Sequence, residues 1–212
     1  MRPVLDLRVY LVTDTRLCGK RGVLATVAAA LAGGVTAVQV RDPQASGRQL
    51  YELAMSVRNR LAGTGVPLIV DDRLDVALAV GANGVHLGQG DLPPPAARAV
   101  AGPDLVIGWS VTDLAQVADA HRFPAGTVDY LGVGPVYGTA TKPDAGPAIG
   151  LIGLQSICAV AAMPCVAIGG IDDTNAAAVT TYGAAGLAVV SAICTAADPG
   201  AAALRIRQAA GW

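Results

Sequence analysis

Three aspartates are the clearest candidates for binding a metal ion. Asp71 and Asp72 follow one apolar run of the sequence, and Asp91 follows the next. Carboxylates at neighbouring strand ends suit a hard cation such as Mg²⁺, which keeps water ligands and shares its coordination shell with substrate phosphate. The alternative is that these side chains cap the helices that follow them, since aspartate is a preferred N-cap residue. Both interpretations stay open on these residues alone, and no cluster of histidine and cysteine suggests zinc.

A second set of candidates could bind an anion. The segment 134–143 contains Thr139, Thr141 and Lys142, and Lys142 is one of only two lysines among 15 basic residues. Hydroxyls, backbone N–H groups and an ammonium together make an oxyanion site. An ordinary loop rich in glycine and proline is the alternative. The Thr-x-Thr-Lys spacing favours the binding interpretation.

Two later segments combine small residues with a hydroxyl. Ile168-Gly169-Gly170-Ile171 ends one apolar run, and Val190-Ser191 ends the next. Glycine lets the backbone approach a ligand closely, and helix N-termini favour anions. A tight turn between a strand and a helix is the alternative, but small residues at both places favour phosphate binding.

The histidines and cysteines carry no chemistry in our interpretation. His86 is expected to be a structural histidine whose hydrogen bonds are satisfied, and His121 to lie on the surface at the end of a helix. The four cysteines, which show no C-x-x-C pair or metal-ligand spacing, are Cys18, Cys158, Cys165 and Cys194. We expect small buried thiols in a reducing compartment.

The elements that must position these residues alternate between short apolar runs and alanine-rich helical stretches. We expect strands over Val9–Thr13, Ala37–Arg41, Leu68–Val70, Gly84–Leu87, Leu105–Trp109, Tyr130–Val133, Cys165–Ile168 and Leu187–Val190. We expect helices over Val23–Ala32, Gly47–Ala62, Arg73–Val80, Ala96–Ala101, Leu114–His121, Leu151–Ala162, Asn175–Tyr182 and Gly200–Ala209. Strands that are apolar throughout are typical of parallel strands covered on both faces.

This alternation predicts an α/β fold, a single (β/α)8 TIM barrel that forms one domain over residues 1–212. A doubly wound open sheet is less favoured, because no G-x-G-x-x-G follows the first strand. Active sites of TIM barrels lie at the C-terminal ends of the strands, and the loops after strands seven and eight are the usual phosphate site. Nearly every expected strand is followed by polar groups, which a purely structural barrel does not need.

Composition limits the classes of partner. The 212 residues are 53% hydrophobic and 15% charged with a net charge of −1, so there is ample core and no basic field to attract nucleic acid or an anionic membrane. The longest apolar run, Val23–Val40, is interrupted by Thr and Gly and indicates a helix and a strand, not a membrane span. The N-terminus lacks the apolar stretch of a signal peptide, and we expect a cytoplasmic protein.

Taken in order, these motifs resemble the thiamin phosphate synthase family. The matching segments are Gln39-Val40-Arg41-Asp42-Pro43, Asp71-Asp72, His86-Leu87-Gly88-Gln89-Gly90-Asp91, Gly108-Trp109-Ser110, Gly134-Pro135 with Thr139-Ala140-Thr141-Lys142, Ile168-Gly169-Gly170-Ile171 and Val190-Ser191-Ala192-Ile193. Each motif is weak alone, but the set keeps the family order and near-family spacing from Tyr10 to Asp198.

The resemblance implies a reaction in which a hydroxymethylpyrimidine pyrophosphate loses pyrophosphate to the ring nitrogen of a thiazole phosphate. It implies catalytic roles for Arg41, Ser110 and Lys142 and a Mg²⁺ site at Asp72 and Asp91. The substrate-binding residues that it implies are Gln39, Val40, Arg41, Asp42, Pro43, Asp71, Ser110, Thr139, Ala140, Thr141, Lys142, Gly170, Val190 and Ser191. It also implies a homodimer that takes small-molecule substrates.

Two positions depart from the family pattern. Pro43 stands where the family has lysine, and Asp71 stands where it has asparagine. The pyrophosphate site thereby becomes about two charge units less favourable, and each charged contact is typically worth roughly 1.5–3 kcal/mol. Our hypothesis from the sequence is that Asp71 recruits Mg²⁺ or a second cation.

Three alternatives to a synthase remain. A thiazole tautomerase has the same fold and resembles the synthase, but it uses a histidine two positions after the serine that ends strand five. This chain has Thr112 at that position. A non-catalytic phosphate-ligand binder is supported only by Pro43 and Asp71. Another phosphosugar barrel enzyme would explain the glycine-rich loops but not Gln39 and Arg41.

Overall fold

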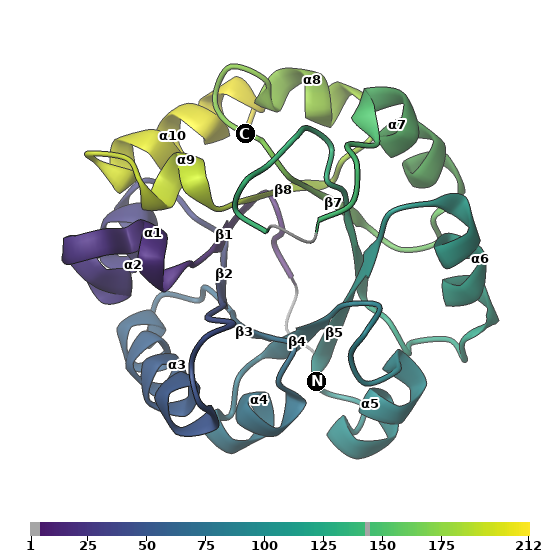
Figure 1. Ribbon diagram of the computed structural model, residues 1–212, viewed down its shortest axis with the longest axis horizontal. Helices are drawn as coiled ribbons and strands as arrows, with labels where there is room; N and C mark the ends of the chain where they lie inside the picture. The colour runs from purple at the N-terminus through teal and green to yellow at the C-terminus, as the bar shows by residue number, and fades with distance from the viewer. Residues whose placement is uncertain (1–4, 143–144) are drawn as a thin grey trace.

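The computed structural model describes residues 5–142 and 145–212, and its centre is a closed barrel of eight parallel strands (Figure 1). The strands are β1 (Val9–Val12), β2 (Ala37–Val40), β3 (Leu68–Asp71), β4 (Gly84–Leu87), β5 (Val106–Val111), β6 (Tyr130–Val133), β7 (Cys165–Ile168) and β8 (Gly186–Val189). They pair in chain order, and β8 pairs with β1 to close the ring. The (β/α)8 barrel is confirmed, and the open doubly wound sheet is wrong.

Helices surround the barrel as an outer ring (Figure 1). They are α1 (Thr15–Cys18), η1 (Gly19–Arg21), α2 (Gly22–Ala32), α3 (Gly47–Leu61), α4 (Leu74–Val80), α5 (Pro94–Ala101), α6 (Leu114–Arg122), α7 (Gly150–Val160), α8 (Ala176–Thr181), α9 (Ser191–Cys194) and α10 (Pro199–Ala209). The strands and long helices predicted from the sequence occur where expected, with ends shifted by one or two residues. The short helices α1, η1 and α9 were not predicted, because a single helical turn is too short to show a period.

The strand side chains build two apolar layers. Residues that point outward, such as Val38 and Val40, pack against the helices in the larger core. Residues that point inward fill the barrel, namely Leu7, Tyr10, Val12, Ala37, Ile69, Val106, Tyr130, Val166 and Ala188. Because side chains alternate along a strand, Gln39 lies inside the barrel between two outward-facing valines. This alternation brings polar side chains into an otherwise apolar interior.

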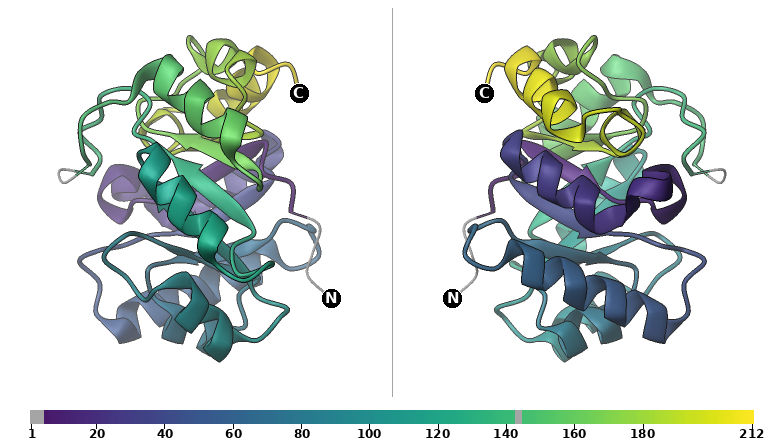
Figure 2. Two further views of the ribbon diagram at one scale, coloured as in Figure 1. Left: turned by 90° about the vertical axis from the view of Figure 1, so that its right-hand side faces the viewer. Right: turned by 90° about the vertical axis from the view of Figure 1, so that its left-hand side faces the viewer.

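All eight strands run in the same direction, so their C-terminal ends open on one face. The segment between β6 and α7 projects from that face (Figure 2). Among residues 5–142 and 145–212, we find no helix with the length and apolar character needed to cross a membrane. All four cysteines are free thiols; Cys18, Cys165 and Cys194 are buried and Cys158 is half-buried.

Candidate active site

A cavity of about 380 Å³ lies at the C-terminal ends of the strands, a size typical of sites for small ligands. It gathers most of the residues that the sequence singled out, although they come from all parts of the chain. Those that line it are Gln39, Arg41, Asp71, Asp72, Ser110, Thr139, Thr141, Lys142, Gly170, Val190 and Ser191. The expectation that one mouth of the barrel collects the polar strand ends therefore holds.

Five of the predicted residues do not line the cavity. They are Val40, Asp42, Pro43, Ala140 and Asp91. Val40 is fully buried against the helices, because it alternates with Gln39 and Arg41. The Asp42 carboxylate accepts a hydrogen bond from the Gln44 amide at 3.2 Å, and Pro43 and Ala140 are exposed. The roles of these residues stay predictions.

Asp72 and Asp91 form the acidic edge of the site. Burial and the neighbouring Asp91 carboxyl group raise the pKa of Asp72 to about 6. The Asp91 Oδ2 also accepts from the Gly88 amide at 2.7 Å. Asp72 has a φ of 58°, a left-handed conformation that aspartate tolerates better than most residues.

The helix-capping alternative for the aspartates is wrong. The N-cap residue of α4 is Arg73, with no side-chain cap, and the N-cap residue of α5 is Pro93. The carboxylates therefore serve neither helix. In the part of the chain that the structure describes, no group of three or more His, Cys, Asp or Glu side chains is arranged to hold a metal ion. A cation at Asp72 and Asp91 would take its other ligands from water or substrate, as Mg²⁺ commonly does.

Asp71 forms an ion pair with Arg41. The distance from Arg41 Nε to Asp71 Oδ2 is 3.2 Å, and the two side chains are only 16% and 13% exposed. Burial and the neighbouring charge of Asp72 raise the pKa of Asp71, while Arg41 and Lys142 oppose the rise. The cavity thus holds opposite charges side by side, with two cations next to the acidic edge.

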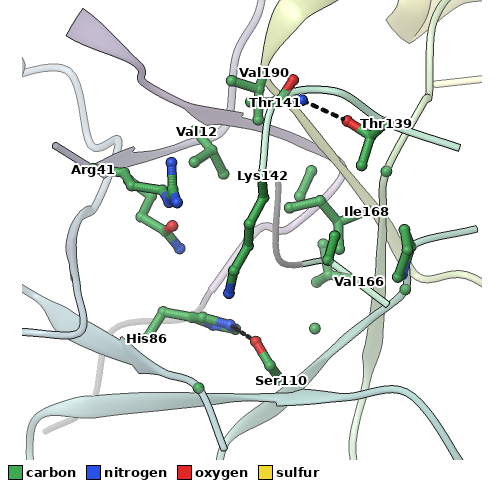
Figure 3. A pocket seen from close by; sticks show the side chains of 18 of the residues that line it. Val12, Arg41, His86, Ser110, Thr139, Thr141, Lys142, Val166, Ile168 and Val190 are labelled. Carbon is green, nitrogen blue, oxygen red and sulfur yellow. Dashed lines mark hydrogen bonds between the residues drawn. The ribbon is translucent and has the colours of Figure 1, made fainter. Parts of the chain in front are cut away.

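The segment after β6 forms the other side of the cavity. Its base is held by hydrogen bonds from the Val136 amide to the Ile168 carbonyl at 2.8 Å and from the Tyr137 amide to the Gly169 carbonyl at 3.0 Å. Farther along, the Thr141 amide donates to Thr139 Oγ1 at 3.2 Å (Figure 3). Pro143, which ends the segment singled out in the sequence, lies outside the described residues, as does Asp144.

Lys142 reaches into the middle of the cavity. Figure 3 shows its side chain descending between Arg41 and Ile168, with the ammonium directed toward His86 and Ser110. Its positive charge contributes to lowering the pKa of His86, after the larger effect of burial. The ammonium is therefore placed to meet an anion that enters between Arg41 and the loop.

Gly170 explains how the loop can lie so close to β7. Its φ is 65°, and a Cβ atom there would be 2.7 Å from the Tyr137 Cβ and 2.9 Å from the Gly138 carbonyl oxygen. Only glycine fits this approach without displacement. The two-glycine motif therefore seats the hydroxyl-rich loop against the end of β7, as well as lining the cavity.

Three polar side chains form the floor of the cavity: Tyr10, His86 and Tyr130. His86 Nδ1 is 3.0 Å from the Tyr130 hydroxyl and His86 Nε2 is 2.9 Å from Ser110 Oγ. The expectation of a satisfied histidine is confirmed, although the ring also lines the cavity. Burial lowers the pKa of His86 to about 4, so the ring is neutral at pH 7.

Tyr10 and Tyr130 were not among the site residues predicted from the sequence. Both lie on apolar strands, and each buries a hydroxyl that requires a hydrogen-bond partner. That requirement is the signal that could have found them, but the partners are distant in sequence. The contact between Gln89 and Ser110 was not predicted either: the Gln89 side-chain amide donates to the Ser110 backbone carbonyl at 2.6 Å.

Some polar strand ends have structural tasks instead. Thr13 is buried, and its Oγ1 accepts from the Arg41 amide at 3.2 Å. Asp14 caps α1 by accepting from the Leu17 amide at 2.9 Å. His121 is exposed near the end of α6, as expected. Thr13 and Asp14 therefore hold backbone near the site, His121 lies on the surface, and none of the three lines the cavity.

Comparison with known proteins connects this chain to one family. The model of a family described as "Thiamine monophosphate synthase" matches residues 9–193. A protein of Azorhizobium caulinodans named thiamine-phosphate synthase is 53% identical over 193 residues, which are 91% of this chain and 90% of that protein. One of Albidiferax ferrireducens with the same name is 50% identical over 202 residues, covering 95% and 91%. The solved structure of a thiamine phosphate pyrophosphorylase from Pyrococcus furiosus has a TM-score of 0.88 and 40% identity, covering 98% and 96%.

Proposed function

Because the chain belongs to the thiamine monophosphate synthase family, we propose that it is a transferase that makes thiamin phosphate. It condenses 4-amino-2-methyl-5-hydroxymethylpyrimidine pyrophosphate with thiazole phosphate and releases pyrophosphate. One observation carries the proposal: a single cavity unites the residues implied for the pyrimidine pyrophosphate with those implied for the thiazole phosphate. Gln39, Arg41, Ser110 and Lys142 form the first group, and Thr139, Thr141, Gly170, Val190 and Ser191 form the second.

The reaction replaces one bond by another at the pyrimidine methylene carbon. The carbon–oxygen bond breaks and its electron pair leaves with pyrophosphate, while the thiazole nitrogen supplies the pair for the new carbon–nitrogen bond. Arg41 and Lys142 stabilise the charge that develops on the departing oxygens. The step needs no general base, which agrees with the neutral, fully hydrogen-bonded state of His86.

We further propose that Asp72 and Asp91 hold Mg²⁺. The Asp91 carboxyl group helps to raise the pKa of Asp72, and a hard divalent cation held by the two carboxylates would offset their repulsion. When bound, the ion would supply positive charge to the pyrophosphate oxygens. Asp72 lines the same cavity as Arg41 and Lys142, so it would hold the ion beside these two cationic side chains.

The ion pair between Arg41 and Asp71 changes our hypothesis about the departure from the family pattern. Asp71 already has a protein cation within 3.2 Å, so a second metal ion is not required to balance its charge. The pair holds the Arg41 side chain across the barrel mouth and partly neutralises it. We propose that the net charge offered to pyrophosphate is lower here than in relatives with lysine and asparagine at these two positions.

The alternatives are weaker on this geometry. Thr112, at the position where a tautomerase would carry histidine, has its hydroxyl 3.2 Å from Gln116 Oε1 and offers no base. A non-catalytic binder would not need Lys142 in the centre of the cavity with Arg41 beside it. Gln39 and the loop that carries Thr139, Thr141 and Lys142 distinguish the cavity from that of a general phosphosugar enzyme.

The test is a turnover assay with purified protein, both substrates and Mg²⁺. We expect thiamin phosphate and pyrophosphate in equal amounts. Isomerisation of a thiazole carboxylate phosphate would favour the tautomerase, and binding of both ligands without turnover would favour the non-catalytic binder. Lys142→Ala is the control variant and should abolish most of the rate.

Assembly and location are also proposals. The family resemblance suggests a homodimer, which sedimentation analysis of the purified chain would check against a monomer. It also suggests a cytoplasmic enzyme, and fractionation of cells that produce the protein would check that location.

A further inference from the structure

Four hydrogen bonds link five side chains across the floor of the cavity. Gln39 Nε2 is 2.9 Å from the Tyr10 hydroxyl, which is 3.0 Å from the Tyr130 hydroxyl. Tyr130 is 3.0 Å from His86 Nδ1, and His86 Nε2 is 2.9 Å from Ser110 Oγ. The chain begins on β2 and ends on β5. Both end residues are implied substrate contacts, whereas nothing so far gives the three middle residues a part in the reaction.

The chemistry of the groups sets the direction of the chain. An amide nitrogen can only donate, so Tyr10 accepts from Gln39. The Tyr10 hydroxyl then donates its hydrogen bond to the Tyr130 oxygen, and the Tyr130 hydroxyl donates to Nδ1 of the neutral His86 ring. The ring proton must therefore be on Nε2, where it is donated to Ser110 Oγ.

The opposite direction is less favourable. If His86 donated from Nδ1 to Tyr130, and Tyr130 to Tyr10, the Tyr10 oxygen would accept twice. The Tyr10 proton, on a residue that is 1% exposed, would then have no acceptor in the chain. Leaving a buried donor unpaired costs about 1–3 kcal/mol.

The strands leave space for this arrangement of rings. A Cβ atom on Gly108 of β5 would lie 2.1 Å from Tyr130 Cζ and 2.5 Å from His86 Nδ1. A Cβ atom on Gly132 of β6 would lie 2.8 Å from His86 Cε1. The two rings thus occupy positions that any other residue at these glycines would block, so the backbone is built around them.

We propose that Tyr10, Tyr130 and His86 are positioning residues that force Ser110 to present its hydroxyl proton to the cavity. Because Ser110 Oγ already accepts from His86, its own proton is the one that remains for a ligand. A ring nitrogen of the substrate, with its lone pair, would accept a hydrogen bond from this hydroxyl. This part of the inference rests on the proposed pyrimidine substrate. At the other end, Gln39 uses its amide nitrogen within the chain and leaves its carbonyl oxygen as an acceptor.

The position of the ring proton can be measured directly, because the chain has only two histidines. In protein labelled with ¹⁵N-histidine, two-bond proton–nitrogen correlation spectra distinguish the Nε2–H from the Nδ1–H form. The variant His121→Gln removes the exposed ring and assigns the remaining signals to His86. We expect the Nε2–H form in the wild type without any ligand, and an Nδ1–H form would overturn the proposal.

Two matched variants each remove one buried hydroxyl. Tyr130→Phe removes the donor to Nδ1, so we expect the His86 nitrogen shifts to move toward each other as both forms become populated. We also expect KM for the pyrimidine pyrophosphate to rise about tenfold, with KM for thiazole phosphate unchanged. Tyr10→Phe leaves the Tyr130 proton with Nδ1 as its acceptor, so the Nε2–H form should persist.

The outcomes separate this inference from the proposed function. An unchanged Nε2–H form and unchanged KM in Tyr130→Phe would overturn the positioning role. If Tyr130→Phe does not fold, the wild-type and Tyr10→Phe spectra still decide the direction of the chain. A wild type without condensation activity but with the Nε2–H form would overturn the proposed function and leave the direction supported.

Discussion

At the scale of single residues, the cavity depends on where each charge is held. Arg41 is paired with Asp71, whereas the neighbouring carboxyl group of Asp91 helps to raise the pKa of Asp72. The sequence identified all four residues, because charged groups at strand ends are visible in a linear pattern. It could not show which charged side chains form ion pairs, because the pairing depends on the barrel geometry that brings β2 beside β3.

Asp72→Asn tests the proposed metal ligand. Asparagine tolerates the left-handed backbone at this position, so the variant loses mainly a charge. We expect kcat/KM to fall about 10–100-fold and the Mg²⁺ concentration for half-maximal rate to rise. Steady-state kinetics over a range of Mg²⁺ concentrations measure both.

Asp71→Asn is the matched control for this prediction. Because Asp71 is balanced by Arg41, we expect its Mg²⁺ requirement to stay within about twofold of the wild type. A large increase in this variant would restore the hypothesis that Asp71 recruits a cation. An unchanged requirement in Asp72→Asn would contradict the proposed site.

His86 should make stability depend on pH. Its pKa is lowered to about 4 from the ordinary value of 6.5, mainly by burial. Between these values the unfolded chain binds a proton that the folded chain does not. The contribution of His86 to stability is therefore complete above pH 6.5 and falls by on the order of 3 kcal/mol as the pH drops to 4.

Denaturant unfolding of wild type and His86→Gln at several pH values measures this effect. The difference in unfolding free energy between the two proteins should shrink as the pH falls from 7 to 4. The same substitution at the exposed His121 is the control for replacing histidine by glutamine. A constant difference for His86→Gln would contradict the neutral buried ring.

At the scale of elements, the alternation of strands and helices was predictable because each element carries its own period. The floor of the cavity was not, because Tyr10, Tyr130 and His86 meet only after three separate strands are placed in the barrel. Likewise, the glycines of β5 and β6 carry no local signal. Their function is apparent only from the rings that fill the space beside them.

Arg98 ties the end of α5 to the neighbouring strands. Its guanidinium donates to the carbonyls of Gly102, Leu105 and Thr127 and to the Asp129 carboxylate. Its ion pair with Asp129 is largely buried, with exposures of 14% and 17%. We expect Arg98→Met to lower the free energy of unfolding by about 2–4 kcal/mol, as measured by urea unfolding.

The exposed pair of Arg122 with Asp119 on α6 is the control. Its side chains are 76% and 52% exposed, so Arg122→Met should change stability by less than about 0.5 kcal/mol. Equal effects of the two substitutions would show that burial does not decide the strength of these ion pairs.

At the scale of the whole molecule, ligands that join both sides of the cavity should stabilise the barrel. Arg41 comes from β2's end, Asp72 from β3's end and Lys142 from the segment after β6, so one bound anion would connect distant parts of the chain. Mg²⁺ with pyrophosphate at about 100 times Kd should stabilise the fold by about 2.7 kcal/mol. For a domain of this size, the melting temperature should rise by roughly 5–10 °C.

Thermal unfolding checks this, with pyrophosphate alone and Mg²⁺ alone as the comparisons. Asp72→Asn should lose the part of the increase that depends on Mg²⁺. An equal increase in the presence of a chelator would mean that Arg41 and Lys142 bind the anion without help from a cation.

The pairing of β8 with β1 has a consequence for how the protein is made. The first strand leaves the ribosome with bare amide and carbonyl groups along one edge, and its partner is synthesised almost last. An open apolar strand edge invites association with other chains. A nascent chain that ends before Gly186 therefore has unpaired edges on β1 and β7. Both edges stay open to association with other chains until translation is nearly complete.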